Sequence, residues 1–363
     1  MANQLRSKRG LVSGTTASGT RPRRVQLQDW EKGRSTRPFF SMKHVLIISI
    51  SQDVHADRVE KLVSVSAPVI RLNMDDPNEW NFEYKNGEPN LRYQSKEFGI
   101  ENIKSVFLRR LPSPKSFQKL VPKNLGKFTD YIVSQKYAIF QECLSILSRT
   151  VTFLNPLRVN EFLGKTIQHF IANRHGLITP ETYVGENPDS AKKFIQEFMN
   201  NGVRICTKPV ENIKIELEDG IKTRFTQLLT PSLLPEINSL KLCPLIFQTY
   251  TEKLFEVRGT IVGSKILACR IDSQAAPGDT AIDWRRYNIP KTPHYKYQIP
   301  TDIERKIISF HKEIEAVYSS FDLIVDKTGN HIFLETNPYG QWLWIEDLTG
   351  LPISKALSEK LLS

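Results

Sequence analysis

The stretch Phe321–Pro338 reads FDLIVDKTGNHIFLETNP and decides the fold of this chain. Two apolar, alternating runs flank residues 327–330, a pattern typical of a β-hairpin. If the turn centres on residues 328 and 329, Asp322 lies directly opposite Glu335. Alternation then puts Asn337 on the same face as Glu335. The hairpin is therefore predicted to gather three oxygen-bearing side chains on one patch.

This patch has two interpretations. Three hard oxygen ligands, with room for phosphate oxygens, are what a magnesium–nucleotide site requires. Alternatively, the acids are solvated residues near the ends of edge strands. The first interpretation depends on the turn, because a slip of one residue would move the whole set to the other face.

Length and composition indicate a globular protein. A chain of 363 residues is long enough for two or three domains, and no window is apolar enough to span a membrane. The four cysteines are widely spaced and show no metal or redox pattern. This usage is typical of a reducing compartment, so we expect a cytoplasmic protein.

The net charge of +11 is concentrated at the N-terminus. Residues 1–42 hold nine Lys or Arg against two acids, a local balance of +7 that leaves +4 for the rest. Residues 1–41 lack periodicity and are predicted to be a disordered basic arm or tag, and a second methionine, Met42, precedes the first strand. The folded part shows no basic stripe with interleaved aromatics, so we expect no nucleic-acid partner.

Strands alternate with helices over residues 42–154, which predicts an α/β domain. This part has no Gly-rich phosphate loop, so a nucleotide is expected elsewhere. Residues 155–240 begin with an amphipathic helix at 160–175 and form a small α+β module. Residues 241–363 hold two hairpins, an irregular loop from 273 to 300, and terminal helices.

Two lysines in the middle module are candidate phosphate ligands. Lys165 lies on its first helix, and Lys208 ends an apolar strand before a proline. An unpaired ammonium at the end of a buried strand is costly, and a phosphate would satisfy it. The alternative for each is a lysine that snorkels to solvent.

Polar groups also follow the next strands. The backbone of Gln248, Thr249 and Tyr250 could hydrogen-bond an adenine edge, although a plain edge strand explains the same pattern. Glu256 and Arg258 share a strand face, where Arg258 could clamp a γ-phosphate or form an ordinary cross-strand ion pair.

Taken together, the order of these residues resembles the ATP-grasp superfamily from Met42 onward. Within it, the chain is similar to the graspetide synthetases, the macrocyclases that mature microviridin-type ribosomal peptides. The resemblance is carried by Phe107-Leu108-Arg109-Arg110, Asn155-Pro156, Thr207-Lys208-Pro209, Phe247-Gln248, Glu256-Val257-Arg258, Ile271-Asp272-Ser273-Gln274, Asp283-Trp284-Arg285 and, most specifically, residues 334–344, LETNPYGQWLW.

The resemblance implies an ATP-grasp fold with an N-terminal pre-ATP-grasp domain, a central lid domain and a C-terminal domain. It also implies a ligase that uses ATP and Mg²⁺ and forms ADP and phosphate. An Asp or Glu side chain of the peptide becomes an acylphosphate, and a hydroxyl or amine of the same peptide displaces phosphate. The product is an ω-ester or ω-amide ring.

The resemblance also suggests residue roles. Lys165 and Lys208 would bind ATP phosphates, residues 248–250 would hold adenine, and Arg258 would stabilise the transferring phosphoryl group. Asp322, Glu335 and Asn337 would hold magnesium, with Asn337 also close to the nucleotide. Weaker candidates for substrate contacts are Arg109, Arg110, Glu256 and Arg285. The group commonly has Asp-x-Arg where this chain has Glu256, which leaves the role of that acid open.

The implied partner is a ribosomal precursor peptide with a leader and an acidic core. In this group a leader helix docks on the central domain, so residues 160–240 are expected to read the peptide, and homodimers are common. The arm contains Arg37-Pro38-Phe39-Phe40, which is similar to a Pro-Phe-Phe of some leaders in this group and leaves open a fused or self-docking leader.

Two other functions remain open. One is an ATP-grasp ligase for small amino acids or short peptides, similar to glutathione synthase or to glutamate-adding enzymes. The other is a non-catalytic nucleotide-binding protein. Dependence on a leader peptide separates the first from a macrocyclase, and ATP turnover excludes the second.

Overall fold

The computed structural model describes residues 42–76, 79–110, 113–118, 121–211, 214–217, 220–223, 226–275 and 292–363. A single compact unit begins at Met42, the residue at which the sequence predicts the folded chain to start. In the described part, no helix is long and apolar enough to cross a membrane. The mixed α/β and α+β class predicted from the sequence is confirmed.

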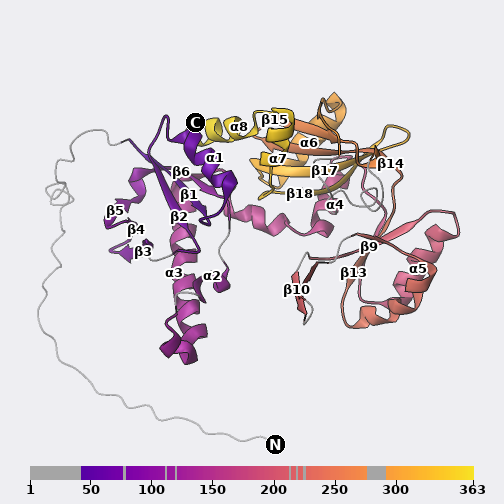
Figure 1. The fold of residues 1–363 in the computed structure, drawn as a ribbon, viewed down its shortest axis with the longest axis horizontal. Helices are drawn as coiled ribbons and strands as arrows, with labels where there is room; N and C mark the ends of the chain where they lie inside the picture. Colours follow the sequence, from indigo (N-terminus) through magenta and orange to yellow (C-terminus); the bar gives the residue numbers. More distant parts are fainter. Residues whose placement is uncertain are drawn as a thin grey trace, which may run out of the picture. The chain divides into compact units, whose positions relative to one another are not determined.

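Four parallel strands in the order β2-β1-β6-β7 form the N-terminal sheet (Figure 1). The apolar run of β1 alternates between two cores, as a strand covered on both faces must. Leu46 and Ile48 pack toward α3, whereas Val45 and Ile47 pack toward α1 and α8. The elements are β1 (His44–Ser49), α1 (Val54–Val63), β2 (Val69–Asn73), β6 (Ile103–Leu108), α2 (Pro114–Gln118), α3 (Thr129–Thr150) and β7 (Thr152–Phe153).

A three-stranded antiparallel meander is inserted before β6. Its strands are β3 (Trp80–Lys85), β4 (Glu88–Tyr93) and β5 (Lys96–Gly99). The turn between β3 and β4 is Asn86-Gly87, with φ of 55° and 95°. Two successive left-handed residues define the turn type that matches the twist of a hairpin, and Asn-Gly is its preferred sequence.

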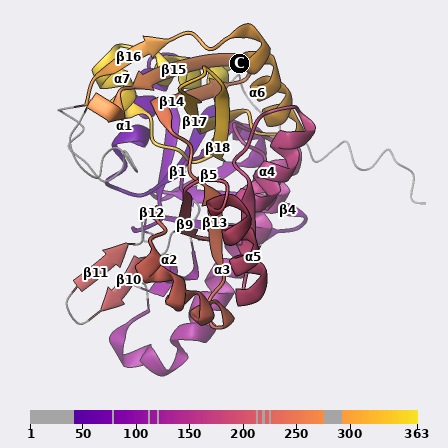
Figure 2. The same ribbon diagram turned by 90° about the vertical axis from the view of Figure 1, so that its right-hand side faces the viewer.

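The central sheet has the order β12-β9-β13-β8, with α5 against it (Figure 2). Asn187 caps α5 through its side chain, and Pro188 fills the first helical position, where no amide donor is needed. The elements are β8 (Thr182–Gly185), α5 (Pro188–Met199), β9 (Ile205–Pro209), β10 (Lys214–Leu217), β11 (Gly220–Thr223), β12 (Gln227–Leu228), the 3₁₀ segment Pro231–Lys241 and β13 (Leu245–Thr249).

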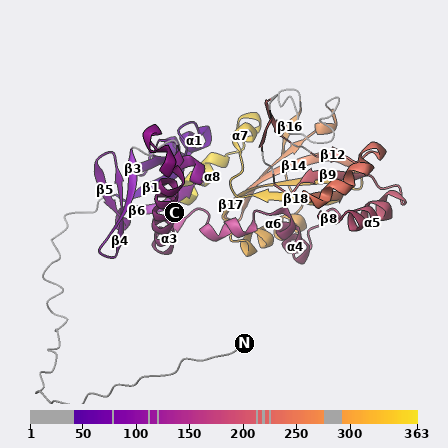
Figure 3. The same ribbon diagram turned by 90° about the horizontal axis from the view of Figure 1, so that it is seen from below.

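The C-terminal sheet has the order β16-β15-β14-β17-β18, and its β14–β15 and β17–β18 pairs are the two predicted hairpins. Helices α4 and α6 share one core with its strands, and Figure 3 shows both helices along one side of β17 and β18. The elements are α4 (Lys165–Arg174), β14 (Lys253–Val262), β15 (Lys265–Ile271), β16 (His294–Tyr297), α6 (Thr301–Glu313), β17 (Tyr318–Asp326), β18 (His331–Asn337), α7 (Leu343–Thr349) and α8 (Ile353–Leu362).

Three elements pack across the boundaries of the predicted domains 42–154, 155–240 and 241–363. Strand β13 pairs with β9 on one side and β8 on the other, so it belongs to the central sheet. Helix α4 packs its buried Ile171 and Ala172 with the C-terminal sheet instead of the central one. Helix α8 packs against α1 in the N-terminal domain (Figure 1). Local sequence patterns do not encode these long-range partners.

Candidate functional site

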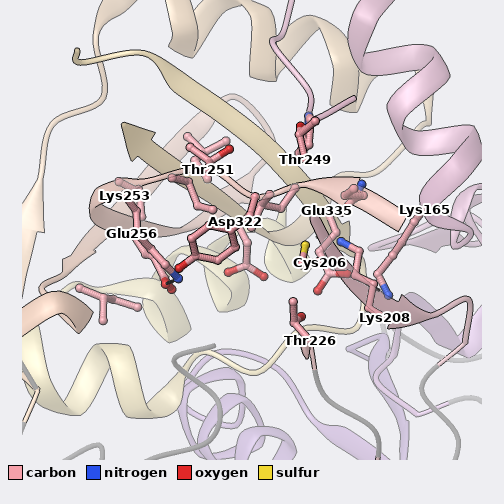
Figure 4. A pocket seen from close by; sticks show the side chains of 18 residues that line it. Lys165, Cys206, Lys208, Thr226, Thr249, Thr251, Lys253, Glu256, Asp322 and Glu335 are labelled. Atoms are coloured by element: carbon pink, nitrogen blue, oxygen red, sulfur yellow. Dashed lines mark hydrogen bonds and ion pairs between the residues drawn. The ribbon is translucent and has the colours of Figure 1, made fainter. Parts of the chain in front are cut away.

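A pocket lies between the central and C-terminal sheets (Figure 4). Its walls come from the start of α4, from β9 and β13, and from the strands β14, β17 and β18. Most of the predicted nucleotide and metal residues are among those that line it. They are Lys165, Lys208, Gln248, Thr249, Tyr250, Glu256, Asp322 and Glu335.

The two predicted carboxylates face each other across the hairpin. Asp322 pairs directly with Glu335, as the sequence predicts. The pairing closer to the turn differs from the prediction, because Leu323 pairs with Phe333. Leu334 is therefore an extra residue in β18 and forms a β-bulge. The bulge lies beside a new backbone contact, in which the Phe333 N–H donates to the carbonyl of Ile178 at 2.7 Å.

Asn337 ends β18 and is exposed, and it is not among the residues that line the pocket. Its Oδ1 accepts the N–H of Tyr339 at 2.9 Å. A carbonyl oxygen has two lone pairs, so this bond leaves one acceptor position on the amide oxygen.

The two predicted lysines reach the same pocket from different elements. Lys165 is the first residue of α4, and its Nζ lies 3.3 Å from Glu335 Oε2. Lys208 lies on β9, opposite Ile246 of β13. In Figure 4 the two lysines lie beside each other near Glu335. Two ammonium groups that converge on one side of a pocket favour an anionic ligand.

Arg258 is buried on β14, directly opposite Asp322. Its Nη1 donates to Asp322 Oδ2 at 2.7 Å, and its Nη2 donates to the Gln341 carbonyl at 3.4 Å. Its Nε is buried and has no hydrogen-bond partner among the described residues. A buried donor of this kind is costly, so a ligand oxygen that accepted from it would be favoured.

Glu256 does not form the ion pair with Arg258 that the sequence left open. It is bonded to Lys253 Nζ, and Ser273 Oγ donates to its Oε1 at 3.2 Å. Burial raises the pKa of the Glu256 carboxyl, and the Lys253 ammonium opposes that shift. Lys253 also lines the pocket, yet sequence reasoning missed it. The available signal was a lysine at the start of an apolar strand, three residues before an acid.

Gln248 and Thr249 end β13, a central strand of its sheet, and Tyr250 follows it, so the alternative of a plain edge strand is wrong. The N–H groups of Thr249 and Tyr250 donate to the carbonyls of Glu181 and Arg204. Those two donors are therefore already used, and an adenine edge would need the carbonyls or side chains. The Arg204 guanidinium lies 4.5 Å from the centre of the Tyr250 ring, which fixes that side chain.

The three arginines predicted to contact substrate have different environments. Arg109 is 0% exposed, which leaves a peptide no surface atom to touch and counts against this role. Arg110 keeps 41% of its side chain exposed, 3.4 Å from Asp53 Oδ2. Arg285 and its neighbours Asp283 and Trp284 lie outside the described residues.

Asp322 and Glu335 have the oxygen donors that a magnesium site requires. No group of three His, Cys, Asp or Glu residues gathers anywhere in the described ranges. Asp322 and Glu335 supply two carboxylates, and the nearby Asn337 has an amide oxygen. This oxygen-only set fits Mg²⁺, which typically takes one or two protein carboxylates together with phosphate oxygens and waters.

Comparisons with known proteins identify the architecture. No family model and no curated protein matches the chain. The macrocyclase MdnC of Microcystis aeruginosa MRC, solved with precursor peptide MdnA, is 26% identical; the match covers 88% of this chain and 99% of that chain, with a TM-score of 0.75. A RiPP-associated ATP-grasp ligase of Chryseobacterium gregarium, solved with ADP and a leader and core peptide, is also 26% identical, covers 88% and 97%, and has a TM-score of 0.74.

The macrocyclase MdnB of Microcystis aeruginosa MRC has the same fold at 24% identity, with 88% of this chain and 99% of that chain covered and a TM-score of 0.69. The predicted fold is therefore confirmed over most of the chain. The carboxylates of its C-terminal hairpin and the two lysines of its pocket lie where the sequence pattern predicts them to converge. Over most of its length, this chain is similar to ATP-grasp ligases of the graspetide synthetase group.

Proposed function

We propose that this protein is an ATP-dependent carboxylate ligase that closes rings in a ribosomal precursor peptide. Two similar structures support a peptide substrate, since one was solved with a precursor peptide and the other with ADP and a leader and core peptide. The rings would be ω-esters or ω-amides, formed from Asp or Glu side chains.

One observation carries this proposal: the carboxylates of two ion pairs line the pocket. Glu335 pairs with Lys165, which also lines it, and Asp322 pairs with Arg258, which is not among the lining residues. Each pair thus brings its carboxylate to the same pocket, with its cation bonded directly to that carboxylate. A magnesium–phosphate ligand has the complementary charges, so it can replace both partners at once. Such an exchange keeps every buried charge paired, which lowers the cost of desolvating the site.

The proposed reaction has two steps. A carboxylate oxygen of the substrate attacks the γ-phosphorus of ATP, the bond to the bridging oxygen breaks, and ADP leaves. A hydroxyl or amine of the same peptide then attacks the acyl carbon, loses its proton, and expels phosphate. Lys165 and Lys208 would bind the phosphates, and Arg258 would stabilise the charge on the transferring phosphoryl group.

Asp322, Glu335 and Asn337 would hold Mg²⁺, which, when bound, neutralises charge on the phosphates. The backbone carbonyls or side chains of residues 248–250 would hold adenine. Glu256 and Arg110 remain candidates for peptide contacts, as does Arg285. Residues 160–240 would bind the leader. Because α4 packs with the C-terminal sheet, the proposed leader-binding surface is limited to the central sheet and α5.

The test is phosphate release and peptide mass in the presence of ATP and Mg²⁺. The peptide is a Glu/Asp- and Thr/Ser-rich precursor that carries its leader. We expect the loss of one water per ring, and Glu335→Ala should abolish it. Glu313→Ala is the matched control, because Glu313 forms ion pairs with Arg174 and His175 at the C-terminal end of α4, whereas Lys165 is at its start.

Other outcomes are equally informative. Turnover with free amino acids or short peptides, and none with a leader-bearing precursor, would replace the macrocyclase by a small-substrate ligase. The absence of turnover with every acceptor, with nucleotide binding intact, would favour a non-catalytic protein.

A further inference from the structure

The segment Pro338–Gln341 links the end of β18 to α7, and buried side chains hold its backbone. Each of its four successive carbonyls accepts a hydrogen bond from a side chain in a different part of the chain. The donors are Asn155 Nδ2 to Pro338 at 3.0 Å, Arg109 Nη1 to Tyr339 at 2.8 Å, Tyr318 Oη to Gly340 at 2.5 Å, and Arg258 Nη2 to Gln341 at 3.4 Å.

The segment also has no room to shift. A Cβ on Gly340 would lie 2.4 Å from Ser320 Cβ and 3.1 Å from the Asn337 carbonyl oxygen. The Gly340 N–H donates to that same carbonyl at 2.9 Å. The backbone therefore packs directly on β17, and a displacement at one residue must move its neighbours.

Arg109 is the donor from the N-terminal domain, just after β6. Its side chain is 0% exposed, and its guanidinium lies 5.5 Å from the centre of the Trp342 ring. Asp53 is its charge partner, at 3.5 Å from Nε. Its Nε and Nη2 make no hydrogen bond to any described residue, so this buried cation is only partly satisfied. Burying such a cation costs free energy of desolvation, and its shortest hydrogen bond, to the Tyr339 carbonyl, offsets part of that cost.

The segment joins two residues of the proposed reaction. At one end, Asn337 Oδ1 accepts the Tyr339 N–H at 2.9 Å, so Tyr339 is held by Asn337 on one side and by Arg109 on the other. At the other end, Gln341 receives the bond from Arg258. Arg109 has no exposed surface of its own, and a single residue, Tyr339, connects it by hydrogen bonds to the proposed ligand Asn337.

We propose that Arg109 is a positioning residue that sets Asn337 and Arg258 through the Pro338–Gln341 backbone. The expected change in kcat rests on the proposed function, whereas the expected change in the position of Asn337 and Arg258 does not. Loss of the guanidinium frees the Tyr339 carbonyl. The Pro338–Gln341 backbone can then shift, and with it the amide of Asn337 and the carbonyl that Arg258 contacts. The lysines that bind phosphates lie on other elements and keep their places.

The expected effect is a split between kinetic constants. In Arg109→Met, kcat should fall about 10- to 100-fold, the usual cost of removing a group that orients a metal ligand. The KM for ATP should stay within about threefold, since Lys165 and Lys208 are untouched. Arg109→Lys keeps the charge beside Asp53 and should recover part of the rate.

Arg71→Met is the matched control. Arg71 is also a buried arginine of the N-terminal domain, and its Nη2 donates to a backbone carbonyl, that of Ile50, at 2.8 Å. It does not touch the Pro338–Gln341 segment. A comparable loss in melting temperature with unchanged kcat in this control would separate positioning from general destabilisation.

The second readout needs no turnover. Calorimetry with ADP should show that Arg109→Met weakens Mg²⁺ binding about tenfold or more, whereas ADP alone binds as it does to the parent protein. This measurement remains decisive if the parent protein acts on no peptide, which would defeat only the proposed function. If Arg109→Met fails to fold, the same titration on Arg109→Lys takes its place. Equal kcat and equal Mg²⁺ affinity in the Arg109 and Arg71 variants would overturn the inference.

Discussion

At the scale of single residues, Arg258 is a buried cation whose guanidinium nitrogens have three different environments. It meets Asp322 through one guanidinium nitrogen and the Gln341 carbonyl through another, while the third is buried without a partner in the described structure. Only a planar guanidinium, with its nitrogens in fixed positions, can place a donor in each of these three environments. The single ammonium group of a lysine cannot.

Arg258→Lys is therefore expected to lower kcat by about 100-fold, although the positive charge is kept. The measurement is initial phosphate release with saturating ATP and precursor peptide. Arg270→Lys serves as the control, since Arg270 lies on the neighbouring strand β15 and pairs with Asp272 instead. A loss of less than threefold in Arg258→Lys would mean that charge alone matters at this position.

The convergence of residues whose types carry a strong local signal could be predicted from the sequence, while their roles stay predictions. Lys165, Lys208, Asp322 and Glu335 all line one pocket, as predicted. Prediction from the sequence failed for Arg109, because nothing next to Arg109 in the sequence indicates that Tyr339 and Trp342 will cover it. Burial by distant segments is a tertiary property that a local pattern does not contain.

At the scale of elements, the β17–β18 hairpin pairs Asp322 with Glu335 as predicted, because an earlier turn and a β-bulge shift the register in opposite directions. Close to the turn, Val325 pairs with His331, so the turn centres on Thr328, half a residue earlier than predicted. The bulge at Leu334 then restores the expected partner of Asp322. Turn residues were visible in the sequence, but a bulge depends on what packs against the strand.

A buried polar network lies behind this hairpin and predicts a pH dependence. His311 Nε2 lies 2.8 Å from Thr336 Oγ1, which lies 2.5 Å from Ser319 Oγ. Burial lowers the pKa of His311 to about 4, below the value of about 6.5 for an unfolded histidine. The neutral ring is thus favoured in the folded state, and its contribution is fully present above pH 6.5.

We expect the free energy of unfolding to fall as the pH drops from 6.5 toward 4, by up to about 1.4 kcal/mol per pH unit from this group. Urea unfolding at pH 7, 6 and 5 measures the slope. In His311→Gln the slope should be shallower, whatever stability the variant loses at pH 7. Parallel slopes in the two proteins would contradict the assignment.

At the scale of the whole molecule, the C-terminal helix α8 completes the N-terminal core. Leu357 and Leu361 are buried with Val45 and Ala56. Ser105 Oγ also donates to the carbonyl of Leu361 at 2.7 Å. The two ends of the described chain are thereby joined in one hydrophobic cluster, which a reading by consecutive domains could not predict.

Leu357→Ala should lower the free energy of unfolding by about 2–5 kcal/mol, the range for a buried leucine truncated to alanine. Leu348→Ala is the control, because Leu348 is 46% exposed on α7. Urea titration followed by the fluorescence of Trp80, a buried tryptophan of the N-terminal domain, reports whether that domain shares the loss. A midpoint unchanged at Trp80 would show that α8 is not part of its cooperative unit.

The position of α8 has a consequence for biosynthesis. The first strand emerges from the ribosome early, yet the helix that covers one face of its sheet is made about 300 residues later, which at 5–20 residues per second is a delay of roughly 15–60 s. During that interval the apolar side chains of Val45 and Ile47 are not covered by α8. The nascent chain is expected to need a chaperone for this face, and its N-terminal domain to mature only after translation has passed Leu362.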